Sequence, residues 1–159
     1  MKIAMLLALL PLPALADPLL DLATAESRAE CVAMGGTLQI PDGAVTLLDL
    51  TGDGVEDAVV SEDGAFCGPD KGYLGGTGGF MIHTVVAGKV QSWQAGSWLL
   101  KDISFTAEGE AQDSFKLLLL GQHGSYCNTF GAAPCVAALT WDGERFVSIS
   151  DGLVQPPAE

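Results

Sequence analysis

Oxygen-bearing side chains alternate along residues 49–57 in a pattern that could bind a hard cation. They stand at the first, third, fifth and ninth positions, and Gly54, at the sixth, permits a sharp turn. Calcium takes six to eight oxygen ligands at about 2.3–2.6 Å, and this spacing is typical of a calcium loop. The predicted ligands are the side chains of Asp49, Thr51, Asp53 and Asp57 and the backbone carbonyl of Val55. We expect a structural Ca²⁺ here; the alternative is an Asp- and Gly-rich turn without metal.

The pattern Asp-x-Thr-Gly-Asp-Gly-x-x-Asp, followed by three apolar residues, resembles the loops of FG-GAP and VCBS-type repeats. It is also similar to dockerin loops and to the first part of EF-hands. The resemblance covers about twenty residues of the chain. In FG-GAP proteins the loop joins two strands of a propeller blade, which implies strands on both sides of this loop. Val60 stands where an EF-hand carries an acidic residue, so the EF-hand interpretation fails, and a single copy of the motif excludes a full propeller.

Short strands are expected to position this loop and to build most of the chain. Turns rich in Gly, Asp and Pro separate them, including Gly88-Lys89 and Asp142-Gly143. The expected strands are residues 37–40, 44–50, 57–61, 80–87, 90–94, 98–105, 114–120, 135–141 and 145–149.

One helix is predicted before these strands, over residues 19–34. Asp17-Pro18 is typical of a helix start, and Gly35-Gly36 of a helix end. The predicted fold class is therefore α+β: one N-terminal helix packed on a mostly antiparallel β-sheet, as a small sandwich or an open barrel. Residues 17–154 are expected to form one disulfide-stapled, β-rich domain, with residues 155–159 as a tail.

The first sixteen residues predict a secretory signal peptide. Lys2 is followed by an apolar run over residues 3–10, and Ala14-Leu15-Ala16 has the small-x-small form that signal peptidase accepts. The apolar run is shorter than the about 20 residues that span a bilayer. No later segment approaches that length, so no membrane span is expected after cleavage.

Four cysteines in an exported chain predict disulfide bonds. Three pairings are possible. Cys127 and Cys135 flank a turn-rich loop, which favours their pairing and leaves Cys31 for Cys67. A zinc site would require close CxxC pairs, and the sequence contains none.

The two histidines are weaker candidates for chemistry. His83 lies in an apolar strand and is expected to be structural. His123 follows a strand, where sites often lie, and Ser125 or Cys127 could act as a nucleophile beside it. Only proximity supports that arrangement, and no residue is assigned a catalytic role. Residues 75–79 are rich in glycine but lack the Lys-Ser/Thr of a phosphate loop, so a flexible linker is expected there.

The strong negative charge narrows the classes of partner. The formal net charge is −13, and an acidic surface repels nucleic acid. The leading hypothesis is a periplasmic or secreted, non-enzymatic, calcium-stabilised module that binds an unidentified protein or small molecule. The alternatives are a small secreted hydrolase using His123, and an inhibitor that presents the loop between Cys127 and Cys135 to a basic enzyme.

Overall fold

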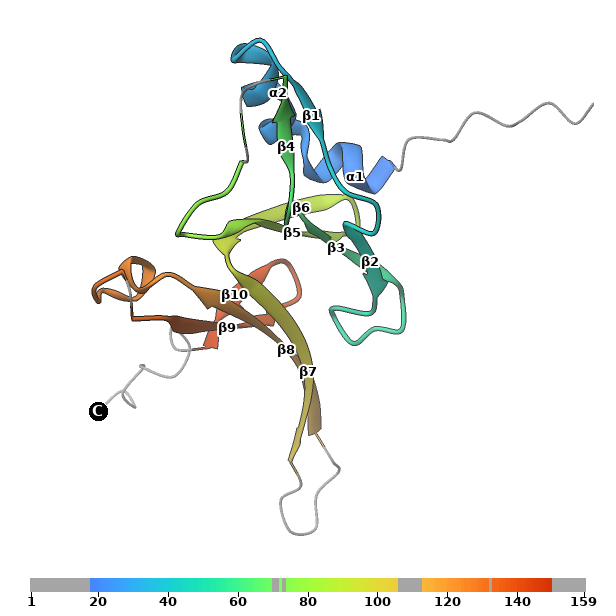
Figure 1. Ribbon diagram of the computed structural model, residues 1–159. Coiled ribbons are helices and arrows are strands. Elements are labelled where there is room, and N and C mark those ends of the chain that lie inside the picture. Colours follow the sequence, from blue (N-terminus) through green and yellow to red (C-terminus); the bar gives the residue numbers. More distant parts are fainter. Residues whose placement is uncertain (1–17, 70–71, 73, 106–112, 132, 150–159) are drawn as a thin grey trace, which may run out of the picture.

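Antiparallel strands form most of the protein (Figure 1). The computed structural model describes residues 18–69, 72, 74–105, 113–131 and 133–149. The predicted signal peptide (1–16) and tail (155–159) lie outside these residues. The helices are α1 (Pro18–Ala23), α2 (Ala25–Ala33) and the 3₁₀ helix η1 (Gly124–Cys127). The strands are β1 (Thr37–Gln39), β2 (Val45–Leu48), β3 (Asp57–Ser61), β4 (Phe66–Gly68), β5 (Phe80–Val86), β6 (Lys89–Ala95), β7 (Ser97–Phe105), β8 (Asp113–Gln122), β9 (Cys135–Trp141) and β10 (Phe146–Ser148).

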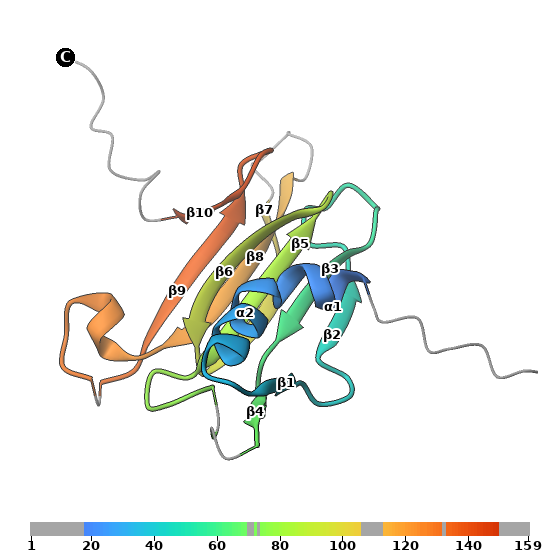
Figure 2. The same ribbon diagram turned by 90° about the horizontal axis from the view of Figure 1, so that it is seen from above.

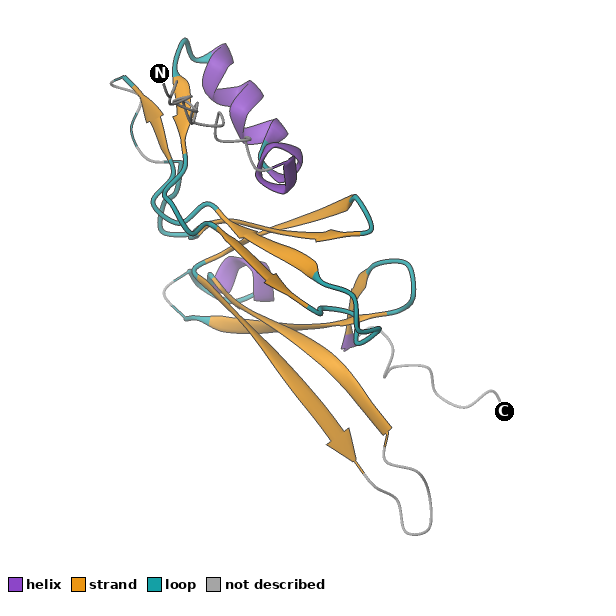
Figure 3. Cartoon of the chain, turned by 90° about the vertical axis from the view of Figure 1, so that its right-hand side faces the viewer, coloured by secondary structure: helices purple, strands orange, loops and turns teal. Residues whose placement is uncertain are grey.

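Two four-stranded sheets lie face to face and enclose the main core (Figure 1, Figure 3). The first sheet has the order β2-β3-β5-β6 and the second β10-β9-β8-β7. Because side chains alternate across a strand, every second residue enters the core. Val59 and Ile82 of the first sheet and Leu118 and Leu120 of the second are fully buried there. Phe146 adds edge-on ring contacts with tryptophans of both sheets, at 6.2 Å from Trp93 and 5.3 Å from Trp141.

The predicted α+β class, with one helix packed on a sheet, is wrong. Strands make up 49% of the described residues and helices only 17%, in a fold of three antiparallel sheets. The expected helix over residues 19–34 is two short helices that meet at Thr24. The buried Thr24 hydroxyl donates a hydrogen bond to the Leu20 carbonyl (2.8 Å), an interaction that often bends a helix. Packing between sheets, and not between helix and sheet, supplies the main core.

The helices lie over the outer face of the first sheet (Figure 2). Ala23 of α1 packs against Ala58, Val60 and Val85 in a small apolar cluster. The helix α2 is tied instead to the two-stranded sheet β1-β4 by the Cys31–Cys67 disulfide. None of the described helices is long and apolar enough to cross a membrane.

The hairpin β5–β6 has a register that matters for the chemistry described below. Its turn is Ala87-Gly88, one residue earlier than the sequence predicted, and both residues have positive φ (48° and 76°). This is the backbone of a type I′ turn, which suits a two-residue hairpin. The turn closes on the pair Val86–Lys89, and the register then places His83 opposite Ser92.

Candidate functional site

The loop 49–57 joins β2 to β3, as the sequence predicted, and its own carboxylates hold it closed. The amides of Gly52 and Gly54 donate to the two oxygens of Asp49, at 2.6 and 3.1 Å. The amide of Val55 donates to Asp53 (2.8 Å), and that of Leu50 donates to Asp57 (3.1 Å). The loop is thus a folded turn with a defined backbone.

The pKa values of the carboxylates at the two ends of this loop shift in opposite directions. The hydrogen bond from the Gly52 amide lowers the pKa of Asp49, and Lys116 on β8 adds to the effect. Burial raises the pKa of Asp57, which is only 8% exposed, and the charges of Asp53 and Asp49 raise it further. A cation in the loop would relieve this repulsion.

The predicted calcium ligands share one loop, but their carboxylates do not gather. Within the described residues, no three Asp, Glu, His or Cys side chains are placed so that they could hold a metal ion. Two features suit a hard cation all the same. The donors are all oxygens, and the hydroxyl oxygen of Thr51 is buried without a hydrogen-bond partner. Gly54 has the positive φ (84°) that the sharp turn requires.

Both disulfides are present, and each joins the pair that the sequence analysis favoured, Cys31–Cys67 and Cys127–Cys135. Disulfides are consistent with an exported protein. The second one closes a segment that projects beyond the end of the two sheets (Figure 1, Figure 2). We call residues 124–131 and 133–135 the display loop.

The display loop is held by its own backbone and exposes two aromatic rings. The Thr129 amide donates to the Gly124 carbonyl (3.0 Å), and the Ala133 amide to the Phe130 carbonyl (3.0 Å). Phe130 is 73% exposed and Tyr126 is 51% exposed. The Tyr126 hydroxyl donates to the side-chain oxygen of Gln94 on β6. The loop therefore presents apolar area from a fixed backbone.

His123, the sequence-predicted catalytic candidate, stands at the base of the display loop. Its Nδ1 lies 2.8 Å from the Ser125 hydroxyl, and the half-buried ring borders an open cleft of about 520 Å³. The described lining is mostly glycine, with Thr77, Ser97 and Gln122 as further polar residues and without a carboxylate. Cys127 is oxidised and cannot act as a nucleophile. The cleft thus offers a histidine and hydroxyls but no acid to orient the histidine.

The glycine-rich residues 75–79, which the sequence predicted to be a flexible linker, form a hydrogen-bonded turn. Gly76 and Gly79 exchange both backbone hydrogen bonds, at 2.9 and 3.1 Å, and close a tight turn before β5. No helix follows the turn, since the strand β5 begins at Phe80.

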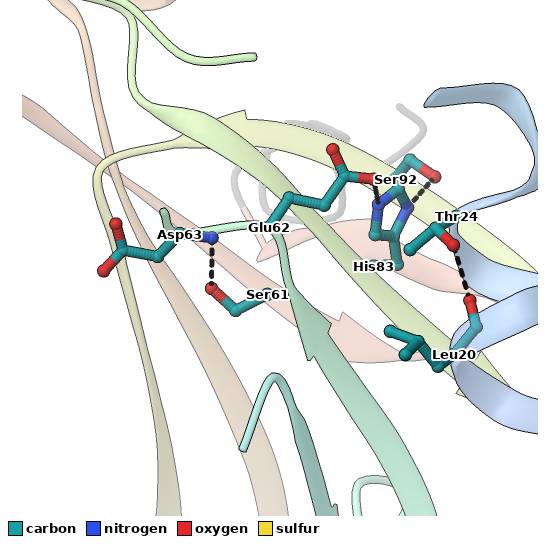
Figure 4. Close-up of polar contacts among 7 residues, drawn as sticks. All are labelled: Leu20, Thr24, Ser61, Glu62, Asp63, His83 and Ser92. Atoms are coloured by element: carbon teal, nitrogen blue, oxygen red, sulfur yellow. Dashed lines mark hydrogen bonds and ion pairs between the residues drawn. The ribbon is translucent and has the colours of Figure 1, made fainter. Parts of the chain in front are cut away.

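A second histidine cluster lies on the outer face of the first sheet (Figure 4). Nδ1 of His83 is 2.8 Å from the Ser92 hydroxyl, and its Nε2 is 3.1 Å from Oε1 of Glu62. His83 and Glu62 are 3% and 2% exposed, whereas Ser92 is exposed. The sequence analysis judged His83 structural and did not consider Glu62 or Ser92. The turn predicted at Gly88-Lys89 would have paired His83 with Gln94, so Ser92 required the observed hairpin register, and Glu62 required knowledge of the β3–β5 pairing.

Comparisons with known proteins give no further guide to these sites. No protein-family model, no curated protein and no solved structure matched the chain. The functional argument therefore rests on the geometry of the sites themselves.

Proposed function

We propose that the protein is a periplasmic or secreted binding module that engages a partner protein through the display loop. The observation that carries this proposal is the disulfide-closed loop with Phe130 at 73% exposure. Exposed aromatic residues are enriched among the few side chains that dominate binding energy at interfaces. A loop that is already ordered loses less entropy when it binds.

The chemistry of the surroundings favours a basic partner. The chain carries 20 acidic and 7 basic residues, so long-range attraction would steer a cationic protein towards it. A projecting, disulfide-braced loop on an acidic body suits an inhibitor that inserts the loop into the cleft of a basic enzyme. We favour this form of the binding role over hydrolysis at His123, because the described cleft brings no carboxylate to that histidine.

We also propose that the loop 49–57 binds a structural calcium ion. The support is the oxygen spacing, the buried and unpartnered Thr51 hydroxyl, and the repulsion that Asp57 experiences from Asp49 and Asp53. The ion would be held by Asp49, Thr51, Asp53, Asp57 and the Val55 carbonyl, and would fix the connection between β2 and β3.

The binding role can be tested by site-specific photo-crosslinking. A benzophenone amino acid replaces Phe130 in the full chain, expressed in cells that make the protein naturally. The matched control carries the same amino acid at Val32, which is 62% exposed on α2. We expect a protein adduct at position 130 that is absent at position 32. The purified partner should then bind Phe130→Ala at least about tenfold more weakly than the wild type. Identical adducts at both positions, or none, would contradict the proposal.

The calcium site can be tested through Asp57. Because the folded pKa of Asp57 is raised, its ionised form opposes folding once the pH exceeds the ordinary value of 3.8. At pH 7 in chelator, Asp57→Asn should therefore raise the melting temperature, since the amide oxygen can still accept from the Leu50 amide. Added calcium should stabilise the wild type but not this variant.

A control variant for the same experiment is Asp142→Asn, in the turn between β9 and β10. Its stability should respond to calcium as the wild type does, because Asp142 lies in a different loop. If calcium and chelator give the wild type the same melting temperature, the metal proposal is wrong.

A further inference from the structure

We propose that Ser92 is a nucleophile for acyl transfer, with His83 as its general base and Glu62 as the residue that positions the histidine. This activity goes beyond the binding role and uses a different face of the molecule. The three side chains form one hydrogen-bonded chain, with separations of 2.8 and 3.1 Å (Figure 4). A hydroxyl, an imidazole and a carboxylate linked in this order can serve as the nucleophile, the general base and the acid that orients the base.

The β5–β6 hairpin places the hydroxyl and the imidazole side by side. His83 and Ser92 are directly opposite in the register. Hydrogen-bonded and non-hydrogen-bonded pairs alternate along an antiparallel ladder, and the pair next to a two-residue turn, Val86–Lys89, is hydrogen-bonded. Counting from that pair, His83–Ser92 is a non-hydrogen-bonded pair, in which side chains lie closest.

The same alternation directs the backbone N–H of Ser92 away from β5, towards the edge of the sheet. An independent contact agrees with this assignment. The Gln94 carbonyl accepts a hydrogen bond from the Gln122 side chain (3.1 Å), so the backbone polar groups two residues from Ser92 also face outward. No other described strand pairs with β6 on that side. The Ser92 N–H can therefore donate to the oxyanion that forms on the carbonyl oxygen of an ester attacked by Ser92, as a nucleophile's own amide does in serine hydrolases.

The hydrogen-bond partners of His83 can set the tautomer that a general base needs. When Glu62 is ionised, Nε2 of His83 donates its hydrogen to the carboxylate, which leaves Nδ1 as an acceptor for the Ser92 hydroxyl. The second oxygen of Glu62 is buried without a hydrogen-bond partner. A negative charge on Glu62 would stabilise the imidazolium formed when the histidine takes the serine proton.

The reaction follows from these positions. The Ser92 oxygen attacks the carbonyl carbon of an ester, and its proton passes to Nδ1 of His83. The tetrahedral intermediate collapses as His83 returns that proton to the leaving alcohol, which leaves an acyl group on Ser92. Water then attacks the acyl carbon and gives a proton to His83, which passes it to the Ser92 oxygen as the acyl–oxygen bond breaks and the carboxylic acid leaves. The net charge of −13 disfavours anionic substrates, so we assign uncharged carboxylic esters that can reach the exposed Ser92 hydroxyl as the substrate class.

The test uses the whole protein with p-nitrophenyl acetate as substrate and diisopropyl fluorophosphate as a covalent probe. We expect one phosphorylated residue, Ser92, in the peptide map, and an ester hydrolysis rate that falls at least about tenfold in Ser92→Ala. The matched control is Ser125→Ala, because Ser125 also contacts a histidine at 2.8 Å but without a described acid. That control should keep the wild-type rate.

The variant Glu62→Gln tests whether Glu62 positions His83 for the reaction or only stabilises the fold. The glutamine amide can donate to Nε2, which would select the tautomer with the hydrogen on Nδ1. Nδ1 could then no longer accept from Ser92, as in the wrong-tautomer variants of serine proteases. We expect a rate at least about tenfold lower with a changed pH profile, and partial rescue in Glu62→Asp. If Glu62→Gln does not fold, Ser92→Ala still decides. Labelling at another residue, no labelling at all, or an unchanged rate in a folded Ser92→Ala would overturn the proposal.

Discussion

The two histidines of this chain have nearly the same local contact and opposite surroundings. Each has Nδ1 at 2.8 Å from a serine hydroxyl. His83 is buried, lies opposite a serine in the β5–β6 hairpin, and contacts the buried carboxylate of Glu62, which directly follows β3. His123 is half buried, pairs with a serine two residues away and borders a cleft that lacks a described carboxylate. The difference between them lies in the third group, not in the histidine–serine contact.

This comparison shows why proximity in sequence is a poor guide to chemistry. His123 and Ser125 lie at the start of the 3₁₀ helix η1, so their contact is local in sequence. The set Glu62–His83–Ser92 requires three strands in register, so its geometry is fixed by the same hydrogen bonds that hold the first sheet. Removing one member of a buried polar network of this kind is costly, because its partner is left buried and unpaired.

The region around His83 and the region around His123 should differ most in how much the free energy of unfolding falls when the histidine is removed. His83→Ala leaves the Glu62 carboxylate buried without a partner, and should lower the free energy of unfolding by about 3–5 kcal/mol. His123→Ala should cost less than about 1 kcal/mol, because no described charge depends on it. Urea unfolding followed by tryptophan fluorescence measures both.

A double variant refines that result. Replacing both members of the pair, in His83→Leu with Glu62→Leu, should recover much of the lost stability, because no buried charge remains. Equal costs for the two single histidine variants would mean that burial does not distinguish the regions.

A second comparison is between the two disulfides, one joining α2 to β4 and one closing the display loop. Cys31–Cys67 closes a separation of 36 residues and Cys127–Cys135 one of 8. Loop-closure entropy predicts losses of about 4 and about 2.5 kcal/mol when each pair is changed to alanine. The first pair is also fully buried, so a cavity adds to its cost. Thermal melts of the two double variants give the order, and a larger loss for Cys127–Cys135 would reverse it.

Much of the strand layout was predictable, because it depends on local sequence patterns. Short apolar runs located β3, β5 and β8, and an Asp-Gly turn located the hairpin β9–β10. The fold class was not predictable in the same way. Helix-favouring composition over residues 19–34 carries no sign that the Thr24 side chain bonds back to Leu20 and divides the helix. Nor does composition show that two sheets would bury each other's inner faces.

The candidate sites also differ in whether local sequence patterns could predict them. The spacing of the loop 49–57 and the disulfide pairs are visible in sequence because they need only short-range patterns or counting. The contact between His83 and Ser92 needs the hairpin register, in which the turn lies one residue from where the sequence placed it. Glu62 reaches His83 only because β3 and β5, separated by the long connection through β4, pair in the sheet. Non-local pairing of this kind is not encoded in any single segment.

The smallest expected effect concerns a side-chain contact between β6 and the display loop. Gln94 lies two residues from Ser92 on β6, and its side-chain oxygen accepts the Tyr126 hydroxyl of the display loop. Tyr126→Phe removes this exposed hydrogen bond and should cost only about 0.5–1 kcal/mol. The loss should appear as faster amide exchange at Thr129, which donates within the display loop, and not at residues of β5.

Tyr126→Phe thereby tests whether the two regions are independent. Sites that share no partner usually behave additively, so ester hydrolysis attributed to Ser92 should be unchanged in this variant. Gln122 also holds β6, through the Gln94 carbonyl, and its bond does not involve the tyrosine. β6 should therefore stay in place when the hydroxyl is lost. Faster exchange at His83 together with Thr129 would show instead that β6 couples the display loop to the buried histidine, and that binding at one face can alter chemistry at the other.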